Sequence, residues 1–78
     1  MSFPRPIKRS LTLRGHRTSV SLEEPFWAIF CQIAEARGLS VNALAAELDE
    51  RRVPPASLAS AIRLFVLEWV LETRAPKG

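Results

Sequence analysis

This chain of 78 residues carries a formal net charge of +3, and 47% of its residues are hydrophobic, so it is one small basic domain. A core of this size is marginal alone, and we therefore expect a symmetric homodimer. The single cysteine, Cys31, excludes an intramolecular disulfide. The most apolar stretch, residues 61–71, contains Arg63 and Glu68 and is too short to cross a membrane. Because the start of the chain also lacks a signal-peptide pattern, we expect a cytoplasmic protein without a membrane partner.

The charge is unevenly distributed along the chain. Residues 1–20 hold five cations and no acid, whereas residues 21–50 hold six acids and only one cation. The five cations are Arg5, Lys8, Arg9, Arg14 and Arg17. Residues 1–9, with Pro4 and Pro6 among the bases, indicate a flexible basic arm. A localised basic patch favours polyanions through counterion release, although a solubilising tail has the same composition.

Residues 10–22, SLTLRGHRTSVSL, alternate polar and apolar side chains, which is the period of a β-strand. Two arrangements fit this pattern. In one, Gly15 turns the chain and 11–13 pairs with 18–20 in a hairpin. In the other, 17–22 is the only strand and pairs with another chain. We find no internal repeat in the sequence.

Two amphipathic helices are predicted next. The first covers residues 23–37, because Pro25 suits the first turn of a helix and Gly38 supplies a left-handed stop. The second covers residues 41–51, and the hydroxyl of Ser40 is expected to cap its first amides.

A third helix is predicted over residues 58–73, after a break at Pro54 and Pro55 and a cap at Ser57. It has two apolar stripes on roughly opposite faces. One stripe is Leu58, Ile62, Phe65 and Trp69, and the other is Leu64, Leu67 and Leu71. Two apolar faces imply contacts on both sides, and a dimer partner would supply the second. The domain is thus expected over 10–73, between the arm and a tail at 74–78.

The combination RTSVSL, a helix start rich in Glu and Pro, and GLSVN at the second helix resembles the ribbon-helix-helix DNA-binding superfamily of MetJ-, Arc- and CopG-like proteins. The wider run from SLTLRGHRTSVSLEEPFW through GLSVNALAAELDERR to LASAIRLFVLEW is similar to an extended bacterial subgroup. The similarity covers residues 10–71, most of the chain. It implies a mostly α-helical homodimer whose short, intertwined antiparallel ribbon lies in the DNA major groove, with an additional C-terminal helix.

The resemblance also implies functional residues. If the apolar strand residues face the core, then Arg17, Ser19 and Ser21 face outwards and match the family's base-reading positions. Arginine can donate two hydrogen bonds to guanine, and serine can bond to several bases. Ser21 has a competing structural role, because it could form a capping box with Glu24. The expected phosphate contacts are Ser40, Val41, Asn42, Arg14, Arg9 and Lys8. The expected dimer core is Val20, Leu22, Phe26, Phe30, Leu44, Phe65 and Trp69.

Catalytic and metal-binding roles find little support. His16 is the only histidine, whereas a metal site needs several ligands at set spacing. Asp49 and Glu50 are adjacent, so they do not share a helix face. We therefore expect no enzyme, metal or cofactor. The sequence predicts a sequence-specific transcriptional regulator, a repressor that occupies double-stranded DNA. The alternative is a protein-interaction module or antitoxin-like component that binds a partner protein through the third helix.

Overall fold

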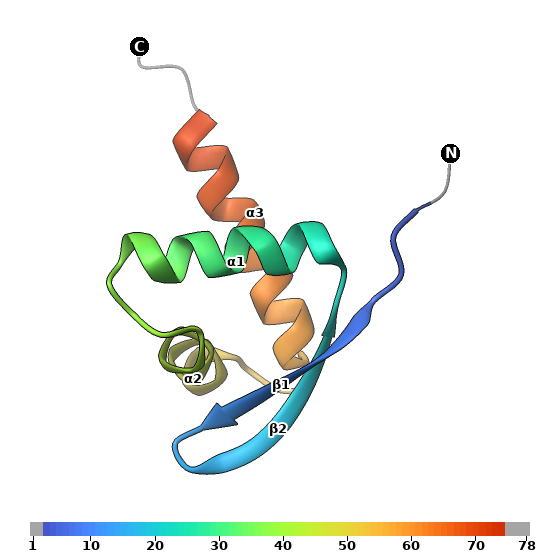
Figure 1. Cartoon of the computed structure of the whole chain (residues 1–78), viewed down its shortest axis with the longest axis vertical. Helices are drawn as coiled ribbons and strands as arrows, with labels where there is room; N and C mark the ends of the chain where they lie inside the picture. Colours follow the sequence, from blue (N-terminus) through green and yellow to red (C-terminus); the bar gives the residue numbers. More distant parts are fainter. Residues whose placement is uncertain (1–2, 75–78) are drawn as a thin grey trace.

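The computed structural model describes residues 3–74 as a two-stranded ribbon followed by three helices (Figure 1). The elements are β1 (Ile7–Leu13), β2 (His16–Leu22), α1 (Glu24–Ala36), α2 (Val41–Arg51) and α3 (Leu58–Arg74). The helices lie on one side of the ribbon, and α1 crosses α3. Each helix begins and ends within one residue of its predicted bounds. The predicted class, mostly α-helical with a short ribbon and an extra C-terminal helix, is confirmed.

The two strands form an antiparallel hairpin within one chain, which is the first of the two arrangements left open by the sequence. Leu13 pairs with His16 across a two-residue turn, and both turn residues have positive φ, 50° at Arg14 and 84° at Gly15. Positive φ at both positions is typical of the type I′ turn, whose twist matches that of a hairpin. β1 begins at Ile7, so three residues expected in the arm pair with β2 instead. A ribbon shared between two chains stays a prediction.

The core lies between the ribbon and the helices. Leu11 and Leu13 of β1 and Val20 and Leu22 of β2 point towards the helices and are buried. Of the residues expected in a dimer core, Val20, Leu22, Phe30 and Leu44 are buried within the single chain, and Phe26, Phe65 and Trp69 pack against them. These side chains therefore stabilise one chain before any second copy is considered.

The ends of the helices follow the sequence signals. Gly38 has a φ of 68°, and the N–H of Leu39 donates to the carbonyl of Ala34 at 2.9 Å, which completes a left-handed stop. The hydroxyl of Ser40 accepts from the N–H of Ala43 at 3.0 Å, and Ser57 caps α3 in the same way at the N–H of Ser60. The predicted caps of α2 and α3 are confirmed.

The start of α1 differs from one expectation. Its N-terminal cap position is Glu23, with no side-chain cap, so Ser21 and Glu24 do not form the capping box that competed with a role for Ser21 on DNA. Instead, the Glu23 carboxylate accepts from Arg63 of α3 at 3.0 Å, and this pairing lowers the pKa of Glu23. Cys31 of α1 is partly buried, and this burial raises the pKa of its thiol.

The two apolar stripes of α3 have different environments. Ile62 and Val66 are buried against the rest of the domain, whereas Leu64, Leu67 and Leu71 are 63%, 50% and 61% exposed. We call these three residues the α3 leucine face. The single chain therefore leaves one apolar side of α3 uncovered, as the two-stripe pattern predicts. Among the described residues, no helix is both long enough and apolar enough to cross a membrane.

Candidate nucleic-acid interface

The ribbon has an outer face, turned away from the helices, that consists of six exposed polar side chains. They are Lys8, Ser10 and Thr12 of β1, which pair in register with Ser21, Ser19 and Arg17 of β2. This face contains two cations and no acid. The residues predicted to read bases therefore lie side by side on one surface, together with Lys8. A two-stranded ribbon of this kind is narrow enough to enter the major groove of DNA.

Sequence reasoning missed two members of the outer face, Ser10 and Thr12. Both alternate with Leu11 and Leu13, so the period of the strand already indicates that their side chains point to the outer face. What the sequence did not give was the pairing of β1 with β2 in the same chain, which places them beside Ser19 and Arg17.

The start of α2 lies at the edge of the ribbon. The backbone N–H of Thr12 donates to the Oδ1 atom of Asn42 at 3.0 Å, which fixes the first turn of α2 beside β1. The N–H groups in the first turn of a helix have no acceptor within the helix. In α2 the N–H of Ala43 donates to the hydroxyl of Ser40. The amides of Val41 and Asn42 remain as donors at the positive end of the helix dipole. The predicted phosphate-binding positions are thus close to the outer face, although the Asn42 side chain is bonded to β1.

The other cations predicted to contact phosphate lie elsewhere. Arg9 points to the helix side of the ribbon, where its guanidinium pairs with Glu24 at 2.6 Å and lies 5.2 Å from the centre of the Trp27 ring. Arg14, in the hairpin turn, pairs with Glu50 of α2 at 2.7 Å. The reason is the strand period, because Arg9 shares the phase of Leu11 and not that of Lys8. Their contacts with phosphate stay a prediction.

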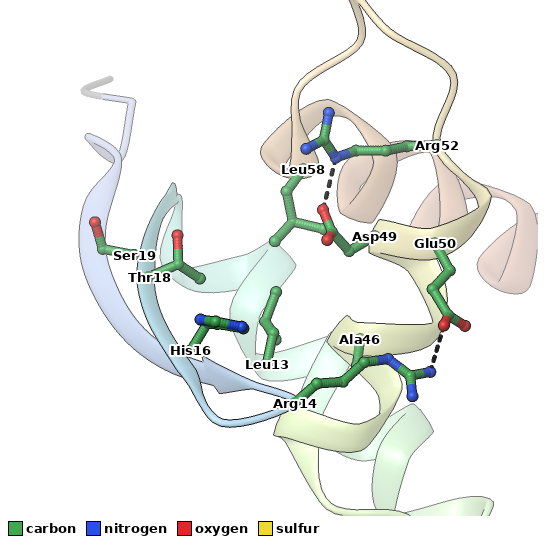
Figure 2. Close-up of a pocket in the computed structure, with 10 residues that line it drawn as sticks. All are labelled: Leu13, Arg14, His16, Thr18, Ser19, Ala46, Asp49, Glu50, Arg52 and Leu58. Atoms are coloured by element: carbon green, nitrogen blue, oxygen red, sulfur yellow. Dashed lines mark hydrogen bonds and ion pairs between the residues drawn. The ribbon is translucent and has the colours of Figure 1, made fainter.

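A cleft of about 350 Å³ opens on the helix side, between the turn end of the ribbon, the end of α2 and the start of α3 (Figure 2). His16 and Thr18 line it from β2. Its charged groups compensate one another, because Asp49 pairs with Arg52 at 2.7 Å and Glu50 pairs with Arg14. Within residues 3–74, no three His, Cys, Asp or Glu side chains come close enough to hold a metal ion.

A two-stranded antiparallel ribbon with a polar, basic outer face and a capped helix start at its edge defines a β-ribbon class of protein. The chain matches the ribbon-helix-helix domain family over residues 6–70, and it belongs to that family. No curated protein and no solved structure matches the chain significantly. Ribbon-helix-helix domains generally bind DNA, as transcription regulators or antitoxins, and typically form dimers.

Proposed function

We propose that this protein is a sequence-specific DNA-binding transcriptional regulator that represses by occupying an operator. The observation that carries the proposal is the outer face of the ribbon, where Lys8 and Arg17 stand among four hydroxyl side chains. Such a face offers donors and acceptors to base edges without placing a carboxylate in the groove. The protein would act in the cytoplasm, on the nucleoid when it is bound to DNA.

Each part of the interface has a separate task in this proposal. Arg17 donates two hydrogen bonds to a guanine, and Ser19 and Ser21 bond to neighbouring bases. The amides of Val41 and Asn42 hold a backbone phosphate, which sets the position of the ribbon on the duplex. Arg9 and Arg14 would have to leave their carboxylate partners to reach a phosphate, so we expect them to add little.

The proposed active form is a homodimer. The α3 leucine face supports it, because Leu64, Leu67 and Leu71 repeat at the i, i+3, i+7 spacing of a helix-packing seam and are at least half exposed. A second copy of α3 would bury these leucines. Sedimentation or light scattering should give twice the chain mass for the wild type. A charged variant, Leu67→Glu, should give the mass of one chain without loss of helix content.

The experiment that tests the function is the binding of the purified protein to duplex fragments, including its own promoter, across a salt series. Tight binding to a preferred fragment that weakens steeply with salt supports the regulator. Weak binding that is equal on all fragments contradicts it.

A second candidate is a module that binds another protein through α3, as an antitoxin-like component does. The exposed α3 leucine face favours it, since that surface fits a hydrophobic partner as well as it fits a second copy. Two results together would establish this candidate in place of the regulator. The protein would form a stable complex with a second protein that is lost in Leu67→Glu, and it would bind all duplexes without a sequence preference.

A further inference from the structure

The two strands of the hairpin repeat each other in sequence. KRSLTL at residues 8–13 and RTSVSL at residues 17–22 align nine positions apart, and similar side chains coincide at five of the six positions. The similar pairs are Lys8 with Arg17, Ser10 with Ser19, Leu11 with Val20, Thr12 with Ser21, and Leu13 with Leu22. This corrects the expectation that the chain has no internal repeat. The repeat is short, and the antiparallel pairing of the strands determines how its two copies are related in space.

The register of the hairpin turns this repeat into an approximate two-fold symmetry. Ser10 pairs with Ser19 at the middle of the ribbon. A two-fold axis through this pair exchanges Lys8 with Arg17 and Thr12 with Ser21, so a cation stands at two diagonally opposite corners of the outer face. The family resemblance implied a two-fold ribbon built from two identical strands of two chains. Here β1 occupies the place of the second strand.

We infer that each chain carries a complete two-stranded reading ribbon, in which Lys8, Ser10 and Thr12 of β1 read bases as counterparts of Arg17, Ser19 and Ser21 of β2. The inference rests on the proposed DNA-binding function. It assigns base reading to Lys8, for which the sequence predicts a phosphate contact, and to Ser10 and Thr12, for which the sequence predicts no contact with DNA. Its DNA target is a short, approximately palindromic stretch read by one hairpin.

The strand edges support a ribbon that is closed within one chain. In a hairpin with a two-residue turn, the backbone groups of alternate residues point away from the partner strand. Two of these outward groups are already bonded to helices. The N–H of Thr12 donates to Asn42, and the carbonyl of Ser21 accepts from Arg63 at 3.2 Å. A strand from another chain would have to displace one of these side chains, which is how edge strands are commonly protected.

The width of the groove supports the same conclusion. Strands lie about 4.8 Å apart, so a four-stranded sheet made from two hairpins would place its outer strands about 14 Å from each other. The major groove is about 12 Å wide and admits two strands. One hairpin fits it, and a second hairpin in a dimer would enter a separate stretch of groove.

The test compares the base preferences of Lys8→Ala and Arg17→Ala with those of the wild type, by selection from randomised duplexes. Thr18→Ala is the matched control, because Thr18 is exposed on the same strand but on the helix side. We expect Lys8→Ala and Arg17→Ala each to lose about 5- to 150-fold in affinity for the selected site. Each variant should lose the base preference at a different one of the two symmetric positions of the selected site. Lys8→Arg, unlike Lys8→Ala, should keep the wild-type base preference. Thr18→Ala should match the wild type in affinity and preference.

Two results separate the failure of this inference from the failure of the proposed function. If Arg17→Ala relaxes both symmetric positions, and Lys8→Ala weakens all duplexes equally and lowers the salt slope by about 1, then Lys8 contacts phosphate and the inference is overturned. DNA recognition by β2 would still hold. If the wild type selects no sequence, the proposed function itself fails, and the inference fails with it.

A cross-link tests the strand pairing directly. Ser10 and Ser19 are opposed in a pair without mutual hydrogen bonds, where Cα atoms lie about 4.5 Å apart and within reach of a disulfide. In the variant Ser10→Cys, Ser19→Cys, Cys31→Ser, oxidation should give a disulfide within one chain, with the mass of a single chain under non-reducing conditions. A covalent dimer would show that these strand positions meet across two chains instead of within one, and the inference would be overturned.

Discussion

Basic side chains have different environments on the two faces of the ribbon. Lys8 and Arg9 are neighbours in the sequence, yet Lys8 is exposed on the outer face while Arg9 lies between Glu24 and the Trp27 ring. In the described part of the chain, Lys8 and Arg17 lie within ion-pair distance of no carboxylate, whereas Arg9 and Arg14 on the helix side and at the turn each have one. The alternation of the strand thus decides whether a basic side chain contacts the helices or is exposed on the outer face. A count of cations along a basic segment therefore overstates the positive charge on the outer face of the ribbon.

The largest expected effect comes from the adjacent residues Leu22 and Ser21, which lie on opposite faces. Leu22 is fully buried, so Leu22→Ala should lower the free energy of unfolding by about 2–5 kcal/mol. Ser21→Ala, at the exposed position, should stay within about 0.5 kcal/mol of the wild type. Urea denaturation measures both. If both variants lost the same free energy of unfolding, the assignment of Leu22 to the core side and of Ser21 to the outer face would be wrong.

The next effect concerns binding. Arg17→Ala should weaken binding to the selected operator by about 1–3 kcal/mol while leaving the free energy of unfolding unchanged. Titration of operator and random duplexes at one salt concentration measures this difference. If the loss is the same on both duplexes, Arg17 contacts phosphate only.

Arg9→Ala should show the reverse pattern. Its contacts with Glu24 and Trp27 should make the variant less stable by about 1 kcal/mol, the usual size of a partly exposed ion pair with a cation–π contact. Its affinity for operator DNA should equal that of the wild type. A lower salt slope with unchanged stability would instead establish the phosphate contact that the sequence suggested for Arg9.

The smallest effect is a pH dependence at the junction of β2 and α1. Hydrogen bonding to Arg63 lowers the pKa of Glu23 below its usual 4.5. A lowered carboxyl pKa stabilises the fold above the unfolded value, and this contribution is lost as the pH falls through the folded value. The stability difference between wild type and Glu23→Gln should therefore be present at pH 7 and shrink as the pH falls below 4.5. A difference that is constant with pH would contradict this account, and Glu72→Gln on the exposed end of α3 is the control.

Several features were predictable because they depend on neighbouring residues. The helix bounds, the stop at Gly38 and the caps at Ser40 and Ser57 follow from periodicity and from hydrogen bonds that span a few positions. The direction of Arg17, Ser19 and Ser21 follows from strand alternation in the same way. The exposed α3 leucine face was also visible as a second apolar stripe.

Other features depended on contacts between distant parts of the chain. The sequence left the pairing of β1 open, because a Gly-containing turn permits a hairpin without requiring one. The partners of Arg9 and Arg63 lie 15 and 40 residues away, so no local pattern reveals them. The repeat between residues 8–13 and 17–22 is visible in the sequence, but its two-fold arrangement on the ribbon depends on the antiparallel register.

By itself, then, the sequence determined the helices, their ends and the alternation that separates polar from apolar strand residues, because these depend on backbone preferences over a few residues. Only the tertiary structure decided that β1 pairs with β2 of the same chain, which cations have carboxylate partners, and which side of α3 is left uncovered. Those outcomes depend on which surfaces meet, and burial of apolar area against the helices selects one pairing among several that local propensity allows.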